Sequence, residues 1–310
     1  MPTESHSGDV TTREVWIEER LDTKIENDYL NLVQTTLILM TSLLIFTVGM
    51  LGNVTTIYIF TRSKKLRQTK VFELILAAFD VYALSLVLPL LTTDLIWEGS
   101  VGQLGNIALS VCGHGYYLTI LCSTIRRYVA VFHPFSYNAF FEKWRPRFLG
   151  SIVMVTILLT TPSVLFNLVL KIKRSPIFFI DAILSTFVSF ATTSFLFARI
   201  ISRLMKTNTV ATTVATTTQS VEMEVHNQDS STSLQTSPTQ FRRKHLVATK
   251  TFATISLCFV VCYVTAFLAA ARLIPRSWFL LYFTNHICNP FIYIVFNREF
   301  RQNVRSLLRV

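Results

Sequence analysis

The sequence predicts an all-α membrane protein, a bundle of seven transmembrane helices followed by a short amphipathic helix. Of its 310 residues, 51% are hydrophobic and only 15% are charged, which is more apolar than a soluble domain with a polar surface. Seven apolar runs occur, and each is long enough to cross a bilayer core as a helix. Runs of this length exclude the short alternating strands of a membrane barrel.

Polar breaks separate the apolar runs, which are approximately 35–60, 71–96, 103–131, 148–170, 177–204, 246–271 and 277–296. The third run is the most polar, so we expect the other helices to shield it from lipid. Beyond the last run, 297–310 places Phe296, Phe300 and Leu307 near one face of a helix and arginines on the other. That pattern predicts a helix lying along the membrane surface.

Lysine and arginine in the short connections predict the orientation, because such loops tend to stay in the cytoplasm. They follow the first run, surround the loop after the third, precede the sixth and follow the seventh. With seven spans, the acidic segment 1–34 then lies outside, as expected for a multi-pass protein of the plasma membrane. The net charge of +11 is spread between apolar runs rather than over one basic face, so nucleic acid is not an expected partner.

The stretch 206–240 is rich in threonine and serine and has few large apolar residues. Such a composition buries too little surface to fold alone, which predicts a disordered third cytoplasmic loop. Phosphorylation of its hydroxyl groups would add charge that recruits a basic partner. The alternative is a solvated linker without a regulatory role.

Several amide and ionisable side chains fall inside the apolar runs, where each costs several kcal/mol unless it is paired. They are Asn53, Asp80, Asn285, His286 and Asn289. Pro290 follows and bends its helix, which frees a backbone carbonyl for neighbouring polar groups. We expect these residues to form one polar cluster at mid-membrane. Asp80 is either a switch residue that senses an ion or a proton, or a purely structural hydrogen-bonding carboxylate.

Five short motifs, in the right order and on the right helices, resemble the rhodopsin-like (class A) G-protein-coupled receptors over about 35–305. They are Gly52-Asn53, Leu76-Ala77-Ala78-Phe79-Asp80, Arg126-Arg127-Tyr128 with the following Val129–Pro134, Phe259-Val260-Val261-Cys262-Tyr263, and Asn289-Pro290-Phe291-Ile292-Tyr293 with Phe296–Phe300. The resemblance implies a receptor that binds an extracellular ligand and activates a heterotrimeric G protein as the sixth helix moves outward. It also implies that kinases and arrestin act on 206–240.

The resemblance assigns roles position by position. Arg127, Tyr128 and Tyr293 match residues of G-protein coupling, with Arg127 as the arginine that the activated G protein meets. Phe259 and Tyr263 match the aromatic toggle of the sixth helix.

The polar residues match the internal switch. Asn53, Asp80, Asn285, Asn289 and Pro290 correspond to that switch, and Asp80, Asn285 and Asn289 to its sodium pocket. Tyr116 stands where a small hydroxyl residue is common, which weakens a sodium site. No other cofactor and no enzyme activity is expected.

Some features depart from the family pattern. Arg126 replaces the acid before Arg127, and His245 stands in a basic run at the start of the sixth run, so the usual ionic lock cannot form. We therefore expect elevated basal signalling. The cysteine at the top of the third run is absent near Gly102, and 171–180 has no partner cysteine, so the disulfide is lost as a pair.

The ligand class follows from elimination and similarity. Leu109 stands where an amine receptor has its aspartate, and Phe283 stands near the place of an opsin's lysine. The chain is most similar to invertebrate FMRFamide-like neuropeptide receptors, which implies a cationic amidated peptide. The outward acids expected to receive it are Asp94, Glu98 and Asp181. Two alternatives remain: a receptor-fold protein that acts as a non-signalling decoy, and, more remotely, a transporter or channel.

Overall fold

The computed structural model describes residues 8–62, 64–97, 102–134, 137–165, 176–221 and 238–308, and these ranges are almost entirely helical, with no strand among them. The helices are α1 (Gly8–Thr61), α2 (Lys64–Thr69), α3 (Val71–Tyr82), η1 (Ala83–Val87), α4 (Leu88–Ile96), α5 (Gly102–Phe132), α6 (Tyr137–Val164), α7 (Pro176–Val221), α8 (Pro238–Ala270), η3 (Arg276–Phe283), α9 (Thr284–Phe296) and α10 (Arg298–Leu308). The predicted all-α class is confirmed for this part of the chain.

Six helical stretches of the described chain are long and apolar enough to cross a membrane. They are Thr23–Thr61, Val71–Ile96, Gln103–Phe132, Ile183–Lys206, Leu246–Ala269 and Arg276–Phe296. They correspond to six of the predicted runs and suggest a multi-pass membrane protein. The remaining run, 148–170, begins in α6, which is not among the six, and 166–175 lie outside the described residues. The seventh span stays a prediction.

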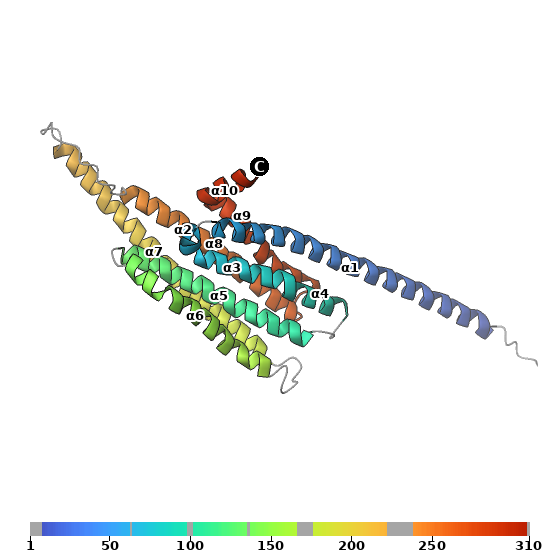
Figure 1. Ribbon diagram of the computed structural model, residues 1–310. Coiled ribbons are helices and arrows are strands. Elements are labelled where there is room, and N and C mark those ends of the chain that lie inside the picture. The colour runs from blue at the N-terminus through green and yellow to red at the C-terminus, as the bar shows by residue number, and fades with distance from the viewer. Residues whose placement is uncertain are drawn as a thin grey trace, which may run out of the picture.

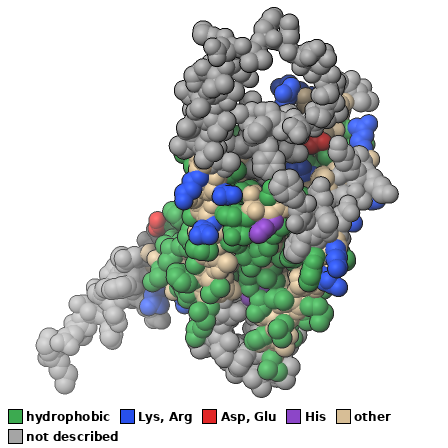
Figure 2. Space-filling view, turned by 90° about the vertical axis from the view of Figure 1, so that its left-hand side faces the viewer, with side chains coloured by type: hydrophobic (Ala, Val, Ile, Leu, Met, Phe, Trp, Pro, Cys, Tyr) green, Lys and Arg blue, Asp and Glu red, His purple; other side chains and the backbone are tan. Residues whose placement is uncertain are grey.

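The long helices lie side by side in one elongated bundle (Figure 1). α5 is the most enclosed of the candidate spans, since 72% of its apolar stretch is buried, against 22% in α7. The expectation that the third run is shielded by its neighbours is thereby confirmed. Figure 2 shows hydrophobic side chains over much of the described part of one face, with lysine and arginine mostly toward its upper part.

α1 and α7 extend furthest beyond the predicted boundaries and project from opposite ends of the bundle (Figure 1). α1 begins at Gly8, so the segment 1–34, predicted as an extracellular tail, is helical from residue 8. α7 continues to Val221, so 206–221 is helical rather than disordered as predicted, while 222–237 lie outside the described residues. The physical reason is shared: no glycine or proline interrupts 9–34 or 177–221, so nothing in the backbone ends either helix.

The second span is one run of helix with a widened turn. η1 is a π-helical turn between α3 and α4, and Pro89 follows it near the start of α4. A proline inside a helix removes one backbone donor and clashes with the preceding turn, and a widened turn relieves both effects.

The predicted amphipathic helix is present as α10, which runs across the end of the bundle (Figure 1). Its N-cap is Asn297, whose Oδ1 accepts a hydrogen bond from the Phe300 amide at 3.1 Å. Phe300 is buried against Phe60 and Tyr293, with ring centroids 5.5 and 5.8 Å away. Arg301 donates to the Ile294 carbonyl at 2.8 Å, which satisfies a free carbonyl at the end of α9. The apolar face of α10 is thus fixed to the bundle.

Candidate functional site

The predicted polar cluster exists, and Asp80 is its centre. Its side chain is completely buried in α3. Oδ1 lies 2.7 Å from Nδ1 of His286, and Oδ2 accepts from Nδ2 of Asn289 at 2.7 Å. Asn289 Nδ2 also donates to the Tyr116 hydroxyl at 2.6 Å. α3, α5 and α9 therefore meet at one carboxylate in the middle of the bundle.

Asn53 attaches α1 to the same cluster. Its Nδ2 donates to the Gly49 carbonyl at 2.9 Å and to the His286 carbonyl at 2.7 Å. The second acceptor lies four residues before Pro290, the position whose carbonyl a helical proline leaves without a backbone donor. The glycine-proline contact beside it is close, because a Cβ built on Gly52 would lie 2.8 Å from Pro290 Cγ. Gly52 thus permits the approach that lets Asn53 reach α9.

An aromatic layer lies directly on the cluster. Tyr116 stacks on Phe259 with ring centroids 5.1 Å apart and an interplanar angle of 14°, and Phe259 packs on Tyr263 at 5.4 Å. The Tyr116 ring also meets the His286 ring edge to face at 5.7 Å. Of the two predicted toggle residues of α8, Phe259 therefore contacts Tyr116 of the polar cluster directly, and Tyr263 reaches it through Phe259.

Asn285 and Tyr293 are buried near the cluster without joining its hydrogen bonds. Within the described part of the chain, neither polar atom of the Asn285 amide has a hydrogen-bond partner, and the Tyr293 hydroxyl has none. Each residue is 1% exposed. Tyr293 instead packs its ring against Phe60 of α1, with centroids 5.8 Å apart.

The residues present do not fit the sodium ion that the resemblance implied. A sodium ion at this site would need Asp80 as its charged ligand, because oxygen ligands hold such hard cations. Both Asp80 oxygens already face nitrogen groups at 2.7 Å, His286 on one side and Asn289 on the other. The imidazole of His286 takes the place beside the carboxylate that a cation would need. No set of three or more metal-ligating side chains occurs elsewhere among the described residues.

The sodium expectation can be tested without any ligand. The thermal unfolding temperature of purified protein should be the same, within about 1 °C, in sodium and in potassium chloride at equal ionic strength, since bound ions stabilise only the state that holds them. The His286→Ser variant removes the imidazole and should become more stable in sodium than in potassium. A sodium-dependent rise in the wild-type protein would show that the ion displaces His286.

A second group of residues lies near the C-terminal end of α5, here called the Arg127 end. Arg127 Nη2 lies 3.9 Å from Glu73 Oε1 of α3, and its guanidinium lies 4.2 Å from the centre of the Phe252 ring of α8. Only 14% of the Arg127 side chain is exposed. Tyr128 faces elsewhere and stacks on Phe132 at 4.3 Å. Arg127 therefore connects α3 and α8, whereas Tyr128 does not take part in that contact.

Arg126 points away from Arg127. Its Nε donates to the Tyr137 hydroxyl and its Nη1 to the Thr69 carbonyl, both at 2.7 Å, and its guanidinium lies 4.4 Å from the centre of the Phe141 ring. The residue therefore joins the α2–α3 connection to α6. Sequence reasoning missed Glu73, although an acid near the start of an otherwise apolar run was the available clue.

The outward acids are only partly described. Asp94 Oδ2 lies 3.4 Å from Arg276 Nη2, with side chains 16% and 38% exposed. Glu98 lies outside the described residues, and Asp181 lies in α7 with a side chain outside the described part. Of the three predicted ligand acids, only Asp94 has a described side chain, so their grouping stays a prediction. Asp94 already has a cationic partner within the chain.

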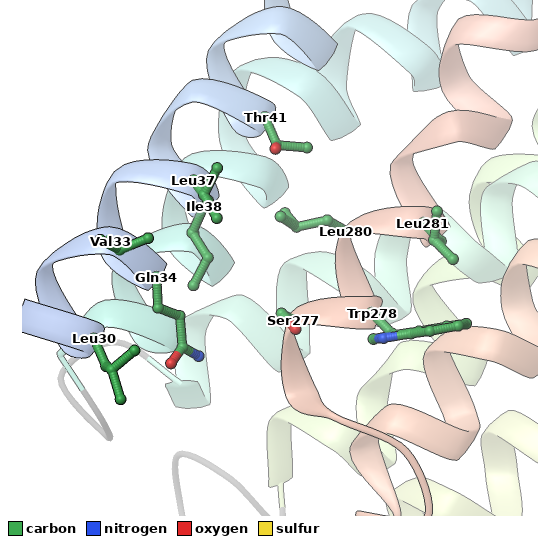
Figure 3. Close-up of a pocket in the computed structure, with 10 residues that line it drawn as sticks. All are labelled: Leu30, Val33, Gln34, Leu37, Ile38, Thr41, Ser277, Trp278, Leu280 and Leu281. Atoms are coloured by element: carbon green, nitrogen blue, oxygen red, sulfur yellow. The ribbon is translucent and has the colours of Figure 1, made fainter. Parts of the chain in front are cut away.

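An open groove of about 680 Å³ lies beside this end of the bundle, between α1 and η3. Figure 3 shows Gln34 and Ser277 on facing walls, and the other lining residues are mostly apolar. Several lining residues, including Leu37 and Trp278, lie in candidate membrane spans, and their side chains are more than half exposed. The groove is therefore open at the surface of candidate membrane spans and is not an enclosed ligand chamber.

No protein-family model matches the chain, and no curated protein matches it significantly. The function therefore has to be inferred from the motifs and from the geometry of the two buried groups.

Proposed function

We propose that this protein is a rhodopsin-like G-protein-coupled receptor that binds an extracellular peptide and activates a heterotrimeric G protein. The observation that carries the proposal is Arg127: a buried arginine at the end of the most enclosed helix, in contact with the aromatic ring of α8. Burying the charge of an arginine costs free energy unless that charge is paired. Membrane proteins place such residues at functional positions. Outward movement of α8 would expose Arg127 to a cytoplasmic partner.

The path from ligand to partner runs through contacts already described. A ligand that turns Tyr263 or Phe259 would shift Tyr116, whose ring stacks on Phe259. Tyr116 shares Asn289 with Asp80, so the disturbance would reach α9. Tyr293 follows one turn later in α9 and has no hydrogen bond for its hydroxyl within the described chain. Its inward turn would complete the opening beside Arg127.

The proposal includes seven spans, with 148–170 as the fourth. That arrangement places 1–34 outside the plasma membrane and the Arg127 end in the cytoplasm, in agreement with the basic connections. It also places the hydroxyl groups of 206–240 on the cytoplasmic side, where kinases and arrestin would act on them.

The proposed ligand is a cationic amidated peptide. Its arginine would compete with Arg276 for Asp94, and exchange of one guanidinium for another costs little when the carboxylate stays paired. A ligand that displaces Arg276 would free η3, which leads directly into α9. Ligand binding would thereby act on the same helix that carries Asn289 and Tyr293.

Guanine-nucleotide exchange tests the proposal. Purified protein in lipid nanodiscs is mixed with a panel of G proteins, with and without a library of amidated peptides. The wild-type protein should accelerate exchange on at least one G protein, and Arg127→Ala should lower that rate at least tenfold, because a charged contact of the active complex is lost. Arg145→Ala, a basic residue of α6 outside the site, serves as the matched control.

A protein that folds but accelerates exchange on no G protein, with any peptide, would instead be the non-signalling decoy. Equal loss in Arg127→Ala and Arg145→Ala would show that only general positive charge matters.

A further inference from the structure

Glu73 is a buried acid that the proposed function does not yet use. It lies in the first turn of α3, and its side chain is only 6% exposed. Its Oε1 lies 3.3 Å from Lys70 Nζ and 3.9 Å from Arg127 Nη2. A buried carboxylate is stable only with partners of opposite charge, and Glu73 has two.

The charges around Glu73 make Arg127 the partner that depends on it. Lys70 lies just before the start of α3, is 24% exposed and has access to water without Glu73. Arg127 is more deeply buried, and among the ion pairs of the described residues Glu73 is its only carboxylate. The neighbouring Arg126 is itself a cation and cannot neutralise the charge of Arg127. It donates hydrogen bonds to the Tyr137 hydroxyl and the Thr69 carbonyl.

We propose that Glu73 is the counter-ion that restrains Arg127 in the resting protein and supplies the function of the acid absent at position 126. This inference assumes that Arg127 is the coupling residue of the proposed receptor. While Glu73 holds the guanidinium toward α3, Phe252 packs over it and keeps α8 against the bundle. Release from Glu73 lets Arg127 turn toward the cytoplasm and removes the cation beneath Phe252.

The inference revises the expectation from the sequence alone. Arg126 was expected to leave Arg127 without a restraint and so to raise basal signalling. With Glu73 in place, the resting state keeps a charged link between α3 and α5. Basal activity of the wild-type protein should therefore be low. Removal of Glu73 should raise it, whereas restoration of an acid at position 126 should not be what controls it.

Two variants separate the two partners of the same carboxylate. Glu73→Gln removes both ion pairs, whereas Lys70→Gln removes only the local pair between Lys70 and Glu73. Both are compared with wild type in the full chain, in nanodiscs without ligand, at matched amounts of folded protein. Glu73→Asp keeps the charge on a shorter side chain and should give an intermediate result.

Two measurements are made on each variant. The first is the distance between spin labels on noncanonical amino acids at Arg62, just after α1, and at Val247 in α8, both exposed positions. The second is the basal rate of nucleotide exchange. Glu73→Gln should shift the distance distribution toward longer values and raise basal exchange about fivefold, the size expected for losing one partly screened ion pair. Lys70→Gln should leave both unchanged.

The outcomes are distinct. A longer distance in Glu73→Gln, with no exchange activity in any variant, would support the restraint and reject the receptor function. Unchanged distance in Glu73→Gln would overturn the restraint, whatever the exchange rate. Equal effects of Lys70→Gln and Glu73→Gln would also overturn it, because the pair between Lys70 and Glu73 would then explain both.

Discussion

Replacing Asp80 with alanine should lower the free energy of unfolding by about 3 kcal/mol, because it leaves the buried donors of His286 and Asn289 without their acceptor. For a chain of this size, that loss corresponds to a fall of about 5–10 °C in the thermal unfolding temperature. Asp80→Asn, which keeps one oxygen acceptor, should cost less. Thermal unfolding is measured in detergent, and size-exclusion chromatography quantifies the folded protein that remains after heating.

The matched control is Asp94→Ala. Asp94 is also an acid of the second span, but its ion pair with Arg276 is longer and partly exposed, so its loss should cost about 1 kcal/mol or less. Equal falls in unfolding temperature for the two variants would mean that the cluster at Asp80 contributes no more to the free energy of unfolding than a surface ion pair does.

Replacing Gly52 with valine should destabilise the protein by about 3 kcal/mol, because the added side chain meets a rigid ring. A Cβ on Gly52 lies 2.8 Å from Cγ and 3.0 Å from Cβ of Pro290, and a proline ring cannot rotate away. Separation of α1 from α9 would also break the hydrogen bond from Asn53 to the His286 carbonyl. Thermal unfolding again gives the measurement.

Gly150→Val controls for the change in helix propensity, since nothing lies within 4 Å of a Cβ built on Gly150. It should be neutral or slightly stabilising. Pro290→Ala in the Gly52→Val background removes most of the ring and should restore part of the loss. Equal destabilisation by Gly52→Val and Gly150→Val would show that the contact with Pro290 is not limiting.

The sequence alone could predict six of the spans and several members of the polar cluster. Bilayer thickness fixes the length of an apolar helix, and lipid penalises each unpaired polar group, so both features leave a direct trace in composition. Asp80 and Asn289 do meet as expected, and Asn53 reaches the same helix at the His286 carbonyl. The ends of the helices were harder to predict, because α1 and α7 continue through polar segments that contain no glycine or proline to end them.

Pairings between distant residues could not be predicted, because they depend on how the helices rotate against one another. His286 was recognised as an intramembrane polar residue, but its hydrogen bond to Asp80 excludes the sodium ion that motif comparison implied. Arg276 and Asp94 are separated by 182 residues, and no motif connects them. Glu73 lies in a run judged only by its apolar length, so its contact with Arg127 was visible only in three dimensions.

Movement of α8 in the presence of a G protein is the decisive measurement. With the labels at Arg62 and Val247, addition of a nucleotide-free G protein should lengthen the distance by several ångströms in the wild-type protein, by the same opening that exposes Arg127. Arg127→Ala should show no such change at the same G-protein concentration. Binding of a G protein without any movement of α8, or an equal movement in Arg127→Ala, would contradict the proposed coupling through Arg127.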